Sequence, residues 1–285
     1  MNRQGDASPS DGSAPAAVPV DDRVTLTIAD HVAELCLNRP DKLNALDLPM
    51  FERLACLIAQ LQEARDVRAV VLHGAGRAFC AGLDLAAMET GGLGLDLLRR
   101  DHGDANLVQQ AAWGWRTLPM PVIAAVQGVA FGGGLQILSG ADIRIGCAGA
   151  RLAIREVNWG LVPDMAGMAL WRGSVRDDVL RELILTGRDV SGEEAQRAGF
   201  LTLVAPDPLA EARRLAATIT ERSPDAVRAA KHLTNLASSG LNARDLLLAE
   251  SSAQKALKGT PNQREAVRAA IERRAARFAD GATEG

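Results

Sequence analysis

Hydrophobic and polar residues follow a strand-like pattern at the start of the chain and then change to a helical spacing. Two β-rich runs, "VTLTI" and "VAELCL", flank "ADH" at residues 29–31 and are closed by Pro40, which predicts a β-hairpin over residues 23–40. In residues 46–64 apolar side chains recur at intervals of three and four positions, which indicates an amphipathic helix. Asp47 stands where such a helix needs an N-terminal cap.

Short apolar strands and helical segments then alternate as far as residue 206. The strands are expected at "VRAVVLHG" (67–74), "PVIAAVQG" (121–128) and "ADIRIGC" (141–147). Strands that alternate with helices are typical of α/β proteins. We therefore predict an α/β core over residues 21–206.

From residue 207 the strand pattern gives way to helical periodicity. Ala, Leu, Arg and Glu dominate as far as residue 278, and Pro224 and Pro261 stand where helices can begin. This predicts a helical region over residues 207–285 that packs on the core, on a neighbouring subunit, or on both. Residues 1–20, which are rich in Ser, Pro, Ala, Gly and Asp, are predicted to form a disordered tail.

Composition excludes several classes of partner. The 285 residues carry a net charge of -3 and only 3% aromatic residues, so neither nucleic acid nor an anionic membrane is expected to bind. The four cysteines and four histidines are scattered, without CxxC or HExxH, so we expect neither a disulfide framework nor a metal site. No apolar run could span a membrane or act as a signal core, which predicts a cytoplasmic protein.

Two glycine-bearing turns each follow a predicted buried strand. They lie at residues 74–88 and 128–140, and the second contains three consecutive glycines. A turn between a strand and a helix leaves backbone N–H groups free to bind an anion or a developing oxyanion. Neither turn matches a nucleotide-phosphate motif. Two such turns in one domain suggest instead two N–H groups that converge on one carbonyl oxygen.

Two acidic residues stand in apolar surroundings eight positions apart. Glu156 and Asp164, taken singly, are typical of helix caps or ion pairs. Together they could form a general acid–base pair whose environments separate their pKa values. Ser139 and Ser174 lack a nucleophile motif. Cys80 is expected to be a small buried side chain rather than a reactive thiolate.

Six segments resemble, in order and spacing, the crotonase superfamily, the enoyl-CoA hydratase/isomerase group. They are "LNRPDKLNALD" (37–47), "GAGRAFCAGLDL" (74–85), "PVIAAVQGVAFGGGLQI" (121–137), "ADIRI" (141–145), "EVNWGLVPD" (156–164) and "LTGRDVSGEEAQRAGFLTLV" (185–204). The resemblance implies a spiral of ββα repeats and a helical region that builds homotrimers, often paired into hexamers. It also implies an acyl-CoA thioester as substrate. Coenzyme A then enters as part of the substrate, and no separate cofactor is expected.

The resemblance also implies roles for individual residues. The backbone N–H groups of Leu83 and Gly133 would hold the thioester oxygen in an oxyanion hole. Phe278 is a candidate contact to coenzyme A bound by a neighbouring subunit. The residues expected around the nucleotide, the pantetheine and the thioester are Lys42, Leu43, Asn44, Ala45, Ala81, Gly82, Asp84 and Gly132.

Two positions depart from the hydratase pattern of this family. Hydratases carry glutamates at the positions of Gln136 and Glu156, which together activate a water, whereas glutamine cannot accept a proton at neutral pH. At the position of Asp164 hydratases usually carry glycine. In this respect the sequence resembles the dienoyl-CoA isomerases, which use acids at the positions of Glu156 and Asp164 but normally have a third acid at position 136. We predict catalysis by Glu156, Asp164 and Gln136, with double-bond isomerisation favoured. The alternatives are hydration by Glu156 with Gln136, and an acyl-CoA-binding protein without turnover.

Overall fold

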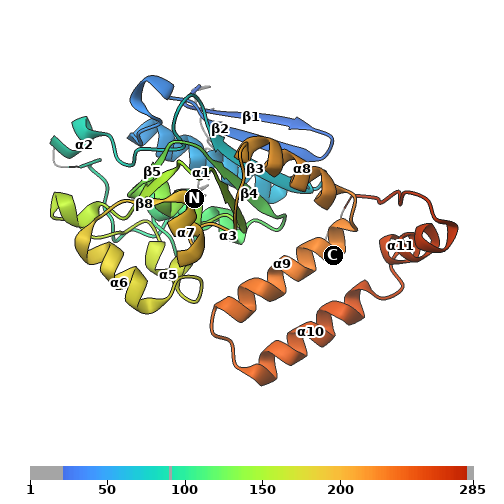
Figure 1. Cartoon of the computed structure of the whole chain (residues 1–285). Helices are drawn as coiled ribbons and strands as arrows, with labels where there is room; N and C mark the ends of the chain where they lie inside the picture. Colours follow the sequence, from blue (N-terminus) through green and yellow to red (C-terminus); the bar gives the residue numbers. More distant parts are fainter. Residues whose placement is uncertain (1–21, 90–91, 281–285) are drawn as a thin grey trace, which may run out of the picture.

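The hairpin at the start of the chain forms as its sequence predicts. The computed structural model describes residues 22–89 and 92–280 (Figure 1), so the predicted tail at residues 1–20 lies outside the described residues. Strands β1 (Val24–Ala29) and β2 (Val32–Leu37) pair antiparallel. The turn between them places Asp30 and His31 at φ 49° and 64°, the left-handed geometry that a two-residue hairpin turn requires.

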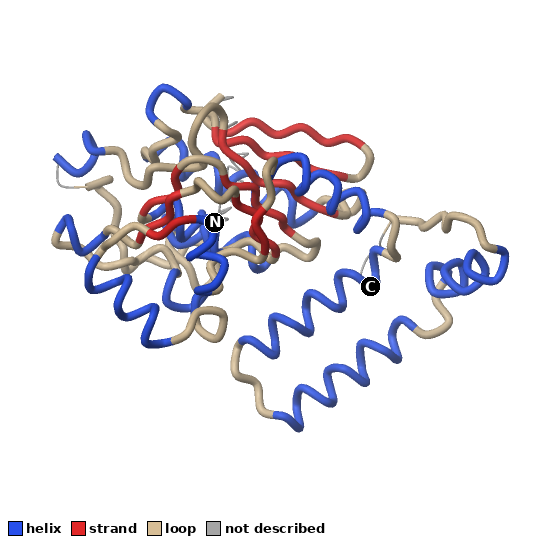
Figure 2. The backbone as a smooth tube through the Cα atoms, in the orientation of Figure 1, coloured by secondary structure: helices blue, strands red, loops and turns tan. Residues whose placement is uncertain are grey.

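A six-stranded sheet forms the centre of the molecule, and Figure 2 shows its strands gathered side by side. The strand order is β1-β2-β3-β4-β6-β9, and every pair from β2 onward is parallel. Parallel pairing brings the carboxyl ends of these strands to one edge of the sheet. The remaining members of the sheet are β3 (Ala69–Gly74), β4 (Val122–Val126), β6 (Ile143–Gly146) and β9 (Leu203–Val204).

Both faces of this sheet are buried. Val70 and Leu72 of β3 belong to the large apolar core on one face, whereas Ala69 and Val71 face the other side. On that second side helix α8 (Pro208–Thr220) covers the sheet with small alanine side chains. Burial on both faces explains why these strands are continuous apolar runs in the sequence.

A smaller three-stranded sheet runs beside the first and gives the chain its spiral. β5 (Val129–Phe131) pairs with β7 (Arg151–Ala153), which pairs with β8 (Val190–Ser191). The chain alternates between the two sheets: β4 and β6 belong to the larger sheet, whereas β5 and β7, the strands that follow them, belong to the smaller one. The helical segments around the two sheets are η1 (Pro40–Lys42), α1 (Leu48–Glu63), α2 (Leu85–Glu89), α3 (Leu107–Thr117), α4 (Gly133–Ser139), η2 (Glu156–Trp159), α5 (Gly167–Trp171), α6 (Asp177–Thr186) and α7 (Gly192–Ala198).

The last three helices project away from the two sheets (Figure 1). They are α9 (Pro224–Ser238), α10 (Ala243–Leu257) and α11 (Pro261–Glu272), and none of the described helices is long and apolar enough to cross a membrane. Helix α10 buries no residue within one chain, and Leu247 and Leu248 are exposed on it. The use of this region to build trimers stays a prediction.

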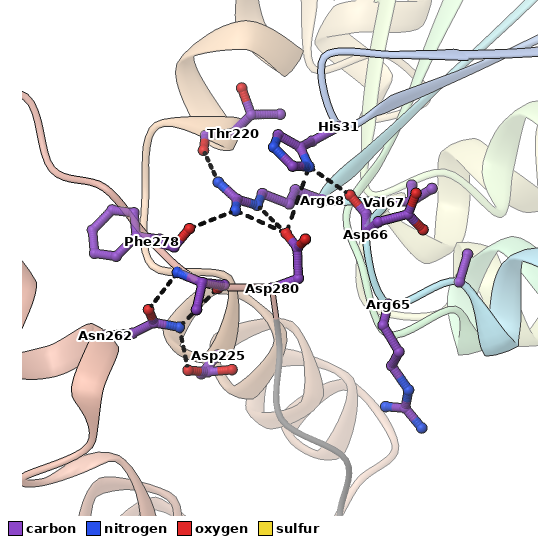
Figure 3. Close-up of polar contacts among 12 residues, drawn as sticks. His31, Arg65, Asp66, Val67, Arg68, Thr220, Asp225, Asn262, Phe278 and Asp280 are labelled. Atoms are coloured by element: carbon purple, nitrogen blue, oxygen red, sulfur yellow. Dashed lines mark hydrogen bonds and ion pairs between the residues drawn. The ribbon is translucent and has the colours of Figure 1, made fainter.

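Arg68 ties the end of the projecting region back to the core (Figure 3). Its guanidinium donates hydrogen bonds to the carbonyl of Phe278 (2.9 Å), to the carboxylate of Asp280 (2.8 Å) and to the carbonyl of Thr220 (3.3 Å). Asn262 of α11 binds the main chain of Ala279 through both its amide nitrogen and its amide oxygen. The chain therefore leaves the core after α8 and returns to the same place.

Lys231 anchors α9 to the core from within. Its ammonium group donates to the carbonyls of Trp115 (3.0 Å) and Met120 (2.9 Å) and lies 2.7 Å from the Asp142 carboxylate. The Lys231 side chain is only 5% exposed, so all three contacts are shielded from water.

Replacing Lys231 with alanine should lower the free energy of unfolding by about 3 kcal/mol, because the carboxylate of Asp142 and two carbonyls lose their cation. Urea unfolding at neutral pH measures this change. Lys255→Ala, at an exposed lysine of α10, is the control and should change stability by less than about 0.5 kcal/mol. Equal losses in the two variants would contradict the anchoring role.

Candidate active site

Asn44 joins the first two loops that follow strand ends. It adopts φ 56° and is fully buried. Its amide nitrogen donates to the carbonyls of Ala75, Ala78 and Phe79 at 2.9–3.1 Å, and its amide oxygen accepts from the N–H of Arg39 at 2.8 Å. Because the side chain is engaged inside the protein, a contact between Asn44 and a substrate would have to come from its main chain.

The other residues predicted to contact the substrate in these two loops lie next to one another. Lys42 is exposed, and the carbonyl of Leu43 accepts a hydrogen bond from the N–H of Ala81 at 2.9 Å. Arg39 donates to the carbonyl of Ala45 and to the carboxylate of Asp84. The pKa of Asp84 is lowered, mainly by the N–H of Ala86 and further by Arg39. Arg39 was not among the predicted site residues, and its place between Asn38 and Pro40 offers no signal for this role.

Two backbone N–H groups near the loop ends remain unengaged. In the β-bridge between Leu46 and Leu83, the N–H of Leu46 donates to the carbonyl of Gly82 and the N–H of Asp84 donates to the carbonyl of Leu46. The N–H of Leu83 itself takes no part in this bridge. Gly133 is the first residue of α4, where an N–H has no partner within the helix. Within residues 22–89 and 92–280, no hydrogen bond engages either group.

Glycine is required at two positions beside these N–H groups. Gly82 adopts φ +93°, and a Cβ there would lie 2.8 Å from the carbonyl oxygen of Phe131 and 3.7 Å from the nitrogen of Gly133. Gly132 adopts φ +50°, and a Cβ there would lie 3.4 Å from Oε1 of Glu156. These distances bring the loop after β3, the start of α4 and the Glu156 carboxylate into one small region.

The carboxylate of Glu156, the first residue of η2, has two unlike oxygens. Oε1 accepts a hydrogen bond from Nε2 of Gln136 at 2.6 Å. Oε2 is buried and has no partner among the described residues. Burial raises the pKa of Glu156, and the like charge of Asp164 raises it further, although the Gln136 amide opposes the shift.

Gln136, in α4, is 1% exposed, and its carbonyl oxygen is fully engaged. Oε1 accepts from the N–H of Met165 at 2.9 Å and from the N–H of Gly167 at 3.0 Å. Between these donors Ala166 adopts φ 67°. A carbonyl oxygen has two lone pairs, so no acceptor site of Gln136 is left for a water. One N–H of its amide remains to donate.

Asp164 immediately precedes the turn that Gln136 holds. The residue is exposed, but protein around its carboxyl removes enough water to raise its pKa. Its negative charge is one of the smaller influences on the pKa of Glu156, which it raises. The structure thus brings Glu156, Gln136 and the Asp164 turn together, as the sequence predicts for a shared site.

Phe278 lies elsewhere in the same chain (Figure 3). Its carbonyl is bound by Arg68, which precedes β3, whereas the loop of Ala81 and Leu83 follows the carboxyl end of β3. The two places are at opposite ends of one strand. A contact between Phe278 and coenzyme A would therefore need a neighbouring subunit, and it stays a prediction.

Two side chains near the site could not be assigned from the sequence. The guanidinium of Arg155 lies 3.6 Å from the centre of the Phe131 ring and pairs with Asp189. Phe131 directly precedes Gly132, and Arg155 directly precedes Glu156. The contact between the guanidinium and the ring therefore links the two chain segments that lead to these residues. Cys80, by contrast, is a buried side chain as predicted, and burial raises the pKa of its thiol to about 12.

The whole core matches proteins of one family. The family model for enoyl-CoA hydratase/isomerase matches residues 27–281. The chain belongs to the enoyl-CoA hydratase/isomerase family. An (E)-benzylidenesuccinyl-CoA hydratase of Thauera aromatica is 32% identical to it over 260 residues, which cover 90% of this chain and 98% of that protein.

Solved structures agree with this membership. A crystal structure of an enoyl-CoA hydratase from Bacillus anthracis has a TM-score of 0.81 and 30% identity, covering 90% of this chain and 98% of that one. An enoyl-CoA hydratase from Mycobacterium tuberculosis H37Rv has a TM-score of 0.80 and 27% identity, covering 91% and 99%. The predicted crotonase-type fold and the prediction of an enzyme family are thereby confirmed.

Replacing Asn44 with alanine should lower the free energy of unfolding by about 3 kcal/mol, because two buried and two half-buried backbone groups lose their partner. Thermal and urea unfolding measure the loss. Asn38→Ala is the matched control, since the Asn38 amide makes one exposed hydrogen bond, to Asp22. If Asn44→Ala were as stable as Asn38→Ala, the buried amide would not be holding the two loops together.

Proposed function

We propose that this enzyme shifts a double bond in the acyl group of an acyl-CoA thioester. Glu156 takes a proton from the carbon next to the thioester carbonyl, and the electron pair spreads onto the thioester oxygen. The N–H groups of Leu83 and Gly133 hold that oxygen. Asp164, protonated at the start, then gives a proton to a carbon further along the chain, so the acyl group gains and loses one proton and only the double bond moves. Glu156 ends protonated and Asp164 ionised, and proton exchange with water returns both to their starting states.

The observation that carries this proposal is the engagement of Gln136. Its carbonyl oxygen is occupied by two backbone N–H groups, and its nitrogen can only donate. Gln136 therefore cannot act as the second proton acceptor that hydratases place beside the first one to activate a water. Asp164 is the acid whose charge reaches Glu156. Burial raises the pKa of both carboxyls, as is common for groups that take part in proton transfer.

Hydration is the second candidate function, and the names of the relatives favour it. The Thauera protein is a hydratase, and the Bacillus anthracis structure is an enoyl-CoA hydratase. In that case Glu156 alone would activate water, with the remaining N–H of Gln136 donating to it. An acyl-CoA-binding protein without turnover is the remaining alternative, and Glu156→Gln separates it from both reactions.

We further propose a homotrimer or hexamer, supported by the exposed leucines of α10.

A parallel assay with a 3,5-dienoyl-CoA and a 2-enoyl-CoA tests the reaction. Absorbance of the conjugated thioester should report isomerisation, and Glu156→Gln should lower its rate by about 10²–10⁴-fold through loss of the base. Asp164→Asn should stop isomerisation while deuterium from D₂O still enters the carbon next to the thioester, a step that needs Glu156 only. Fast hydration that is indifferent to Asp164→Asn would exclude the proposed relay in favour of hydration.

The pH dependence of that deuterium exchange tests the electrostatics. Glu156 must be ionised to act as a base, so exchange should fall as the pH drops through its pKa, which burial raises from the ordinary value of a glutamate. Asp164→Asn removes the like charge that raises the pKa of Glu156. The acidic limb of the exchange profile should therefore move to lower pH in this variant. A limb that moves to higher pH would contradict the assignment of Glu156 as the base.

A further inference from the structure

The orientation of the Gln136 amide follows from its partners. The N–H groups of Met165 and Gly167 can only donate, so the amide atom that faces both of them must be the carbonyl oxygen. The amide nitrogen must then face Glu156, where it donates to Oε1 at 2.6 Å. The side chain has no second orientation that satisfies these three contacts.

This orientation makes the two oxygens of Glu156 unequal. Oε1 is committed to the amide of Gln136, whereas Oε2 is buried without a partner among the residues that the structure describes. We propose that Gln136 is a positioning residue that commits Oε1 of Glu156 and leaves Oε2 as the single atom through which Glu156 takes the proton from the substrate. This inference rests on the proposed function of Glu156 as the base.

Gln136 also holds the second acid of the proposed relay. Its carbonyl oxygen closes the turn at residues 165–167, in which Ala166 adopts the unfavourable φ of 67°. Asp164 immediately precedes this turn. One amide therefore sets the position of Oε2 on one side and of the Asp164 main chain on the other.

The charges around Glu156 explain why an amide suits this place. Helices α4 and α5 carry no charged residue, and Arg155 is turned onto Phe131 and Asp189. Asp164 adds a negative charge that raises the pKa of Glu156. A carboxylate at position 136 would face Oε1 of Glu156 at hydrogen-bond distance, and the two acids would have to share a proton. Glutamine gives the same contact without a second negative charge.

Two substitutions at position 136 test this role by deuterium exchange at the carbon next to the thioester. Gln136→Met keeps the volume but removes the donor, so kcat should fall by about 10²-fold with KM nearly unchanged, because Oε2 is no longer held in place. The acidic limb of the profile should move to higher pH, since the amide no longer stabilises the carboxylate.

Gln136→Glu, when protonated, can accept hydrogen bonds from both N–H groups and donate one to Oε1 of Glu156. Its activity should therefore be kept while the two carboxyls share one proton, and should fall as the pH rises and that proton leaves.

Ser139→Ala is the matched control. Ser139 also joins α4 to α5, through the hydrogen bond that Nε1 of Trp171 donates to its hydroxyl at 2.7 Å, and its described hydrogen bonds do not involve Glu156. This variant should lose stability without a shift of the acidic or the alkaline limb of the deuterium-exchange pH profile. An identical shift in Ser139→Ala, an unmoved acidic limb in Gln136→Met, or the absence of a high-pH loss in Gln136→Glu would each overturn the inference.

Glu156→Gln separates failure of this inference from failure of the proposed function. If Glu156→Gln still exchanges the proton at the wild-type rate, Glu156 is not the base and the proposed function fails together with the inference. If Glu156→Gln abolishes exchange while Gln136→Met retains the wild-type rate and pH profile, the base is correct and only the positioning role of Gln136 is excluded.

Discussion

Parallel pairing of the central strands is the constraint on which the rest of this structure depends. Because β2, β3, β4 and β6 run in the same direction, the chain leaves each of them at the same edge of the sheet. Residues 42–45 follow β2 and residues 81–84 follow β3, whereas residues 132–136 and 156–164 follow β5 and β7, which pair parallel in the smaller sheet. Together these segments contain every predicted site residue except Phe278. Segments far apart in sequence thus meet because the strands before them are neighbours.

Buried amides hold these segments together, and the ion pair between Arg39 and Asp84 adds to the contact between the first two. Asn44 joins the loops after β2 and β3, and Gln136 joins α4 to Glu156 and to the turn before α5. An amide can donate and accept at once, so it satisfies backbone groups of both kinds without placing a charge in the apolar interior. The carboxylate of Glu156 remains the buried charge that the arrangement leaves half engaged, and this inequality is what makes it chemically useful in the proposed reaction.

The C-terminal helical region is attached to the core at a few fixed points. It begins and ends beside Arg68, and Lys231 fixes α9 to the core, while α10 buries nothing in a single chain. Helix α10 packs beside α9 but leaves Leu247 and Leu248 exposed, as a helix that awaits a further partner would. The firm attachment at both ends would present α10 in one orientation, which suits the proposed oligomer.

The sequence by itself determined the elements and the family. Period-two and helical spacings, the cap at Asp47 and the prolines at 224 and 261 act locally, and the hairpin, α1, α9 and α11 form where they predict. The motifs also predict a shared site for Glu156, Gln136 and Asp164, and the structure brings Gln136 into contact with Glu156 and with the turn that follows Asp164. Only the tertiary structure decided what each side chain does there. The partners of Gln136 are Glu156, 20 residues away, and the N–H groups of Met165 and Gly167, 29 and 31 residues away. These contacts arise only when α4, η2 and the turn before α5 are packed together, so no local pattern could reveal them.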